Sequence, residues 1–369
     1  MHHVHEPDRS PLTSVGPGSG WIPAHQRSRA ASTSSTITKE SERFLRIGVV
    51  NNLRAGKSQE QVSRMLGFLS DHPDVLHVET ESAGVMPEAL VDLARQEVDL
   101  LVVNGGDGTL QYVLTEILGS DVFGERIPLV APLRAGRTNM SAMDLAADRD
   151  PLRGLAELIA CAEDGRIAER VEPRRVLRVS YGYGIQRASQ YGMFFGAGLI
   201  KRAIELNHRL FDQKGQRAVV EGVPGATMVT ASLIGRAVTG DTSGILTPDK
   251  VQILLDGEAV DQGEFHLVIA STLSHLFARM RPFWGQGPGG VRFTSIAAPC
   301  EKLCRSALGV LRGKPADWVT PENGFTSRNV ERAELRMSCG FTVDGELWQP
   351  DPDRSIALSA ERVVHFVRA

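Results

Sequence analysis

The sequence has 369 residues, 42% of them hydrophobic and 23% charged, and its formal net charge is −3. These values are ordinary for a soluble globular protein with one large or two medium domains. The slightly negative net charge argues against a nucleic-acid partner, because binding to phosphate backbones needs a basic face. No apolar run approaches the length of about twenty residues that a membrane span needs, and a signal-peptide core is missing. We therefore expect a cytoplasmic protein whose membrane contact is at most peripheral.

Residues 1–43 are rich in Ser, Thr, Pro, Gly, His and Arg and poor in aliphatic side chains. Such a segment cannot bury enough apolar surface to offset the entropy of ordering it, so it is predicted to be a disordered tail. The folded part is expected to begin at residue 44.

Strand patterns alternate with helix patterns between residues 44 and 165. The apolar runs at 46–52, 99–103 and 127–131 are typical of strands in a parallel sheet that is covered on both faces. Residues 62–69 carry apolar side chains at helical spacing. This alternation predicts a doubly wound α/β domain over residues 44–165.

After residue 166 the pattern changes to short runs of alternating apolar and polar residues, which is typical of antiparallel strands. The runs are 176–181, 250–255, 265–270, 291–296 and 334–343. Asp-Gly pairs at Asp256 and Asp344 fit hairpin corners. A second, β-sandwich-like domain is predicted over residues 166–340.

The segment most indicative of chemistry is Gly105-Gly106-Asp107-Gly108-Thr109, which follows an apolar strand and opens a helix. Glycines let the backbone approach phosphate oxygens, and a helix N-terminus offers unpaired N–H groups. An aspartate beside phosphates makes sense if it organises a magnesium ion or accepts a proton. The structural alternative is a plain glycine turn in which Asp107 caps the helix. We favour the functional interpretation, because all five residues occur in this order directly after an apolar strand.

Two common nucleotide fingerprints do not fit this chain. No Gly-x-Gly-x-x-Gly occurs in a Rossmann setting, and no complete Gly-x-x-x-x-Gly-Lys-Ser/Thr loop is present. The Gly105–Thr109 loop therefore predicts a nucleotide triphosphate site of another type.

With its flanking motifs, the loop resembles the diacylglycerol kinase catalytic-domain family, which includes bacterial lipid kinases and sphingosine kinases. The loop itself is shared with NAD kinase and phosphofructokinase. The turn at Asn51-Asn52, the Thr80 segment and the stretch 132–145 resemble further motifs of the narrower family. The sequence FTVDGELW at 341–348 resembles the family's C-terminal Asp-Gly-Glu hairpin.

The resemblance implies an NAD-kinase-type α/β domain, an antiparallel β-sandwich, and a C-terminal segment, residues 341–369, that returns to the first domain. It implies an ATP- and Mg²⁺-dependent kinase that phosphorylates a hydroxyl of diacylglycerol or a related lipid at a membrane surface. Asp107 would be the acidic, metal-binding centre at the γ-phosphate, and Glu346 the second catalytic carboxylate. The implied nucleotide-contacting residues are Asn51, Asn52, Thr80, Gly105, Gly106, Gly108, Thr109, Thr138 and Asn139. The sequence is compatible with a homodimer.

Several positions depart from the family pattern. Tyr112 stands where the family has a glutamate, Met140 where an acidic residue often follows the asparagine, and Ser271 where lipid kinases usually have asparagine. The turn associated with a structural magnesium in some bacterial members is Gly287–Gly290 here. Two alternatives therefore stay open: an NAD-kinase-like enzyme, and a relative that binds nucleotide or lipid without catalysis.

Local basic clusters occur at Arg174-Arg175 with Arg178, and at Arg279 with Arg281. Such clusters are usually solvated surface, and contact with a lipid or a phosphate is the functional alternative.

Overall fold

The computed structural model describes residues 45–54, 59–80, 85–120, 122–183, 186–205, 247–300 and 302–369. The predicted tail, residues 1–43, lies outside this range. Within it, the strands divide between a six-stranded sheet and an eleven-stranded sheet.

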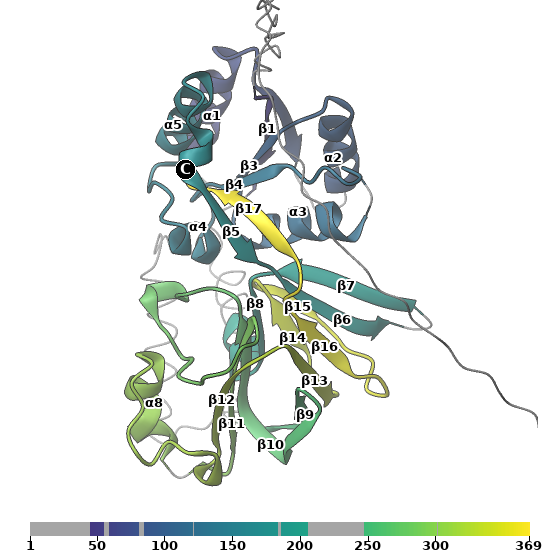
Figure 1. Ribbon diagram of the computed structural model, residues 1–369, viewed down its shortest axis with the longest axis vertical. Coiled ribbons are helices and arrows are strands. Elements are labelled where there is room, and N and C mark those ends of the chain that lie inside the picture. Colours follow the sequence, from purple (N-terminus) through teal and green to yellow (C-terminus); the bar gives the residue numbers. More distant parts are fainter. Residues whose placement is uncertain are drawn as a thin grey trace, which may run out of the picture. The chain divides into compact units, whose positions relative to one another are not determined.

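The six-stranded sheet has the strand order β2-β1-β3-β4-β17-β5 (Figure 1). Its strands are β1 Ile47–Asn52, β2 Leu76–Thr80, β3 Leu100–Asn104, β4 Leu129–Pro132, β5 Val171–Arg175 and β17 Val363–Val367. Pairing is parallel throughout except between β17 and β5. Every residue of β3 is buried, as the unbroken apolar run predicts for a strand covered on both faces.

Helices cover both faces of this sheet. They are α1 Gln59–Ser70, α2 Met86–Arg95, α3 Asp107–Gly119, α4 Met140–Asp144 and α5 Pro151–Glu163. Helices α1 and α5 share one hydrophobic core with alternate residues of β1 and β3, while α2 and α3 share the other core with the remaining residues. The result is a three-layer α/β domain whose strands β1 and β3 end together at one edge.

The eleven-stranded sheet is antiparallel and curls around a second core. Its early strands are β6 Leu177–Tyr183, β7 Gln186–Gly192, β8 Phe194–Gly198, β9 Asp249–Leu255, β10 Glu258–Ser271 and β11 Val291–Ala298. Its later strands are β12 Phe325–Val330, β13 Arg332–Met337, β14 Phe341–Val343, β15 Glu346–Trp348 and β16 Ile356–Ser359. Helix α8, Leu303–Leu311, packs beside β11 and β12 through a small separate core.

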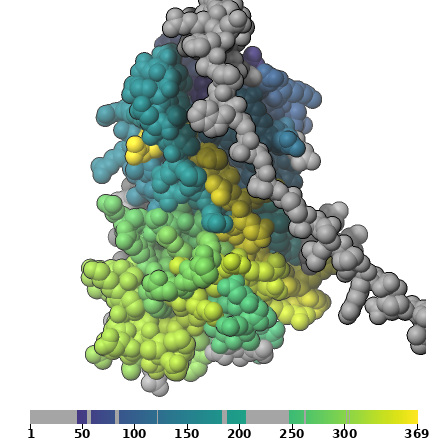
Figure 2. Space-filling view, viewed as in Figure 1, coloured from purple at the N-terminus to yellow at the C-terminus, as the bar shows by residue number. Residues whose placement is uncertain are grey.

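The predicted fold class, an α/β domain followed by an antiparallel β domain, is confirmed. Strand β5 extends the first sheet beyond residue 165, and of the segment 341–369 only β17 joins that sheet, since β14, β15 and β16 belong to the second. Figure 2 shows residues of the yellow C-terminal end among the teal residues of the first domain. In the described part of the chain, no helix combines the length and apolar character needed to cross a membrane.

Candidate active site

The glycine loop occupies the turn between β3 and α3, where close packing excludes side chains. A Cβ atom on Gly105 would lie 2.5 Å from the side chain of Thr109. A Cβ on Gly106 would lie 3.2 Å from the Cα of Gly136, on the loop after β4. Gly106 is also the N-cap of α3 and has an extended backbone, so its neighbours present the first N–H groups of the helix. The loop is thus backbone without side chains at the N-terminus of α3, the kind of position where anions bind in other proteins.

Asparagine side chains tie the ends of β1 and β3 to this loop. The buried Asn104 donates a hydrogen bond of 2.7 Å to the Oδ1 atom of Asn51. Asn52 donates from Nδ2 to the Thr109 hydroxyl at 2.8 Å. Thr80 is paired in register with Asn52 and is also buried. Four of the predicted nucleotide-contacting residues therefore meet at one sheet edge.

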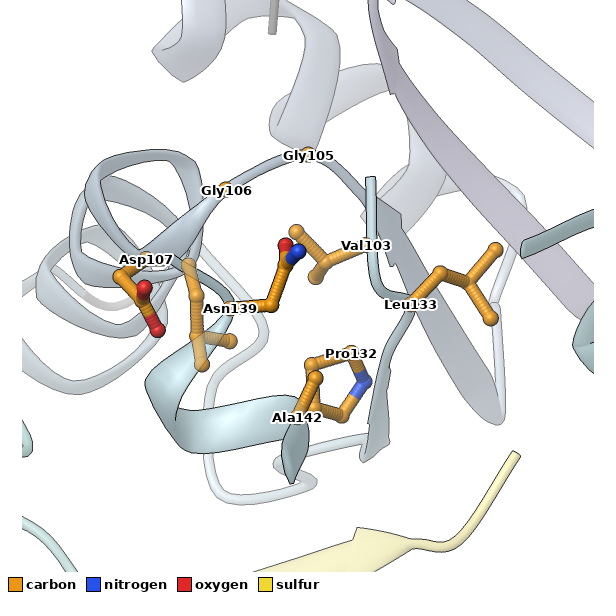
Figure 3. A pocket seen from close by; sticks show the side chains of 9 residues that line it. Val103, Gly105, Gly106, Asp107, Pro132, Leu133, Asn139 and Ala142 are labelled. Carbon is orange, nitrogen blue, oxygen red and sulfur yellow. The ribbon is translucent and has the colours of Figure 1, made fainter. Parts of the chain in front are cut away.

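A second loop, between β4 and α4, faces the glycine loop across a small pocket. Asn139 has a left-handed backbone with φ of 52°, and its side chain accepts from the N–H and donates to the carbonyl of Gly136. Figure 3 shows the Asn139 amide lying below the Gly105–Gly106 turn, beside Val103 at the end of β3. Thr138 precedes it and is partly buried. The pocket is accordingly bounded by the two predicted motifs.

Asp107 connects the two loops. Its carboxylate accepts one hydrogen bond from the Met140 N–H and one from the Ser141 N–H, each of 2.9 Å. These N–H groups begin α4, so the aspartate caps that helix from outside it. Burial raises the pKa of the Asp107 carboxyl, while the two N–H groups act in the opposite direction. Met140, which departs from the family pattern, contributes its backbone here.

The hairpin of β14 and β15 brings the second carboxylate to the loop. Its turn, Asp344-Gly345, has positive φ at both residues, and Glu346 is the first residue of β15. A Cβ on Gly108 would overlap with the Oε1 atom of Glu346. The glutamate therefore rests directly against the first turn of α3.

Asp344 is a third carboxylate at this place, where the Asp-Gly pair alone predicts only a hairpin turn. Its side chain is buried and accepts a 2.8 Å hydrogen bond from the Met193 N–H. Burial raises the pKa of Asp344 well above its ordinary value, and the negative charges of Asp107 and Glu346 raise it further. An aspartate in an Asp-Gly turn looks unremarkable in sequence, so only the Asp-Gly-Glu resemblance could have singled it out.

Tyr112, which stands at the position of the family's glutamate, lies close enough to Glu346 to respond to its charge. Burial raises the pKa of the Tyr112 hydroxyl, and the nearby Glu346 carboxylate raises it further. A phenol thus replaces a carboxylate on the α3 face that Glu346 contacts.

Comparisons with known proteins agree with this geometry. Residues 46–167 match the family model of the diacylglycerol kinase catalytic domain. A stretch of 84 residues is 29% identical to an NAD kinase of Teredinibacter turnerae, covering 21% of this chain and 29% of that protein. The chain therefore spans less than a third of the curated relative that it matches.

Among solved structures, a diacylglycerol kinase from Bacillus anthracis str. Sterne is similar with a TM-score of 0.55. The sequences are 16% identical, and the likeness covers 89% of this chain and 98% of that one, so both domains share its fold. The match to the diacylglycerol kinase catalytic domain is thus confined to residues 46–167, and the likeness to the solved structure shows a shared fold.

Proposed function

We propose that this protein is an ATP-dependent lipid kinase that transfers the γ-phosphate to a hydroxyl of diacylglycerol or a related lipid. The observation that carries this proposal is the contact between Glu346 and Gly108. It joins a proton-accepting carboxylate to a loop suited to phosphate. Phosphoryl transfer needs positioning, charge neutralisation and a base for the attacking hydroxyl, and little covalent chemistry.

In this proposal the nucleotide phosphates lie against the backbone of Gly105 and Gly106, at the N-terminus of α3. The first N–H groups of a helix lack intrahelical partners, and the positive end of the helix dipole lies there. The bond from Asn52 to Thr109 holds the start of α3 against β1. Glu346 accepts the proton of the acceptor hydroxyl, and Asp107 fixes the second loop beside the γ-phosphate.

Magnesium is the metal that this chemistry would use. Among the described residues, no group of three or more His, Cys, Asp or Glu side chains has the arrangement of a metal cage. Such a cage is not required, because Mg²⁺ is commonly held by one or two carboxylates together with substrate phosphates. Asp107 fits that role, and the buried Oδ1 atom of Asp344, which has no hydrogen-bond partner in the described structure, fits as a second ligand. When bound, the ion would neutralise charge on the phosphate oxygens.

The acceptor would reach the site from a membrane surface, with the protein bound peripherally. An NAD-kinase-like activity is the second candidate, because a stretch of the chain matches an NAD kinase. A binding protein without catalysis is the third, since Tyr112 and Met140 replace residues that are acidic in the family.

One experiment separates these functions. The purified chain is incubated with γ-labelled ATP and magnesium, with either a total lipid extract or NAD as acceptor. We expect label in the organic phase, lost in Asp107→Asn and Glu346→Gln. The matched control is Glu258→Gln, because Glu258 follows the other Asp-Gly hairpin turn but is exposed and pairs with Arg328. Label in NAD would support the second candidate, and no label with either acceptor would support the third.

A further inference from the structure

Three arginines gather beside the far end of α4, outside the site described above. They are Arg174 on β5, Arg281 on the loop after β10, and Arg292 on β11. Arg292 is close enough to the other two for their charges to act on it. We call these residues, together with His275, the arginine cluster.

Three consecutive residues of one loop each hold one arginine. The carbonyl of Leu273 accepts from Arg292 at 2.7 Å. The hydroxyl of Ser274 accepts from Arg174 at 3.2 Å, and the Nε2 atom of His275 contacts Arg281. One short segment thus positions three guanidinium groups: that of Arg174, 100 residues before its partner, and those of Arg281 and Arg292, 6 and 19 residues after theirs.

A buried aspartate fixes this segment. Asp144, the last residue of α4, accepts from the N–H groups of Ser274 and His275 at 3.1 and 2.9 Å. Its Oδ1 atom is also 3.2 Å from the Nδ1 atom of His275. Asp144 thus holds the segment of Leu273, Ser274 and His275 against the end of α4.

Positive charge exceeds negative charge at this place. Arg174 pairs with the exposed Glu172 and lies 3.7 Å from Asp144. Arg281 and Arg292 have no carboxylate at ion-pair distance among the described residues. The three guanidinium groups carry three positive charges, whereas the neighbouring carboxylates of Asp144 and Glu172 carry two negative charges. Burial lowers the pKa of Arg292, and although Asp144 opposes this, the charges of Arg174 and Arg281 lower it further.

The arginine cluster is accessible, and its loop is strained. Arg281 is exposed, while Arg174 and Arg292 are partly exposed. Ala278 and Arg279, just before Arg281, both have left-handed backbone angles, with φ of 53° and 57°. Non-glycine residues rarely adopt such angles unless the surroundings impose them, and they concentrate at ligand sites. Within the described structure, the Arg174 Nε atom is also buried without a hydrogen-bond partner.

We propose that the arginine cluster is a binding site for a phosphate group, separate from the glycine loop. Forked guanidinium donors suit the tetrahedral oxygens of a phosphate monoester or diester. Such a group would supply the negative charge that the three arginines lack. The phosphate belongs either to a small soluble molecule or to the headgroup of an anionic lipid. The proposal goes beyond the kinase function and does not depend on it.

The first part of the test uses inorganic phosphate, titrated into the full-length protein at constant ionic strength with chloride as the balancing salt. Binding is followed by calorimetry and by the rise in melting temperature that a bound ligand produces. We expect Arg281→Gln and Arg292→Gln each to weaken binding about tenfold, the usual effect of losing a charge-assisted contact. Arg281 is exposed, so its substitution should leave folding intact.

Two control variants locate the phosphate. Arg332→Gln removes an exposed arginine that pairs with Glu334 elsewhere on the surface, and should bind phosphate as the wild type does. Asn52→Ala alters the glycine-loop side, and should also leave this affinity unchanged. If Asn52→Ala abolishes binding while Arg281→Gln does not, the phosphate occupies the glycine loop and the proposal is wrong.

The second part uses sedimentation with phosphatidylcholine vesicles, with and without phosphatidylglycerol. Binding only to the anionic vesicles, weakened in Arg281→Gln and Arg292→Gln, would identify a lipid headgroup as the source of the phosphate. Binding of inorganic phosphate without vesicle binding would identify a soluble ligand. If neither probe distinguishes these variants from the wild type, the arginines only brace the fold and the proposal is overturned.

Discussion

Glu346 rests against Gly108, although Glu346 begins strand β15 of the eleven-stranded sheet and Gly108 lies in helix α3 of the first domain. The contact exists because Gly108 has no side chain. The β14–β15 hairpin can therefore bring a carboxylate directly onto the first turn of α3.

Gly108→Ala should separate catalysis from stability. The added methyl overlaps with the end of the flexible Glu346 side chain, which can move aside, so folding should tolerate it. We expect turnover to fall about 100-fold, because a displacement of about 1 Å at a reacting group has that effect. Steady-state kinetics and urea unfolding measure the two quantities. The control is Gly67→Ala in α1, where nothing lies within 4 Å of the new Cβ; it should leave turnover unchanged. Full activity in Gly108→Ala would contradict the placement of Glu346.

Asp107→Asn should lower kcat by about 100- to 1000-fold, since it removes charge where the γ-phosphate is expected to react. The stability cost should be about 1 kcal/mol or less, because the amide oxygen still accepts one of the two N–H groups at the start of α4. Asp150→Asn is a matched control, since Asp150 also caps a helix with its carboxylate, as the N-cap residue of α5 that accepts from the Leu152 N–H. An equal loss of activity in both variants would count against a specific role for Asp107.

Asp344 should make the protein less stable as the pH rises. Its pKa is raised on folding by burial, so above the ordinary value of 3.8 the folded state holds a proton that the unfolded chain has released. Stability therefore falls with pH, by at most about 1.4 kcal/mol per unit for this one group, until the folded-state pKa is passed. Asp344→Asn should flatten the profile of unfolding free energy measured by urea titration from about pH 5 to pH 8. Asp256→Asn, at the exposed hairpin turn, should keep the wild-type slope. If the wild type, Asp344→Asn and Asp256→Asn all show the same dependence of unfolding free energy on pH, Asp344 does not have the predicted effect.

The bond between Asn52 and Thr109 should act on nucleotide binding. Thr109→Val keeps the shape and removes the hydroxyl that accepts from Asn52 at 2.8 Å. We expect the KM for ATP to rise about tenfold with a smaller change in kcat, which corresponds to about 1.4 kcal/mol of ground-state binding. Combining it with Asn52→Ala in a double-mutant cycle should give a coupling energy of about 0.5 to 1.5 kcal/mol. Additive effects would show that the two side chains act independently.

Much of the first domain follows from local sequence. The apolar run of β3 and the glycines after it predict both the strand and the loop, because each depends on residues close together in the chain. The contacts of Asp107 do not follow in this way. Its partners are the backbone N–H groups of Met140 and Ser141, and any residue type except proline supplies an N–H. Sequence patterns of side chains therefore carry no signal for this contact.

The two Asp-Gly hairpins show where prediction from sequence stops. Asp256 and Asp344 both have left-handed backbones, with φ of 51° and 48°, and both precede a glycine with positive φ. Asp256 is exposed, whereas Asp344 is 6% exposed and faces Asp107. The difference arises from where each hairpin lies in the curled sheet. Local turn chemistry is the same at both positions and cannot distinguish them.

Strand β17 sets an order for folding. It lies between β4 and β5 in the first sheet, yet it follows the whole second domain in the chain. During synthesis the ribosome must therefore produce the entire antiparallel domain before the parallel sheet can close. Until then β4 and β5 each lack a neighbouring strand, and open strand edges favour aggregation. The segment that matches the family model, residues 46–167, therefore ends before two strands of its own sheet, β5 and β17.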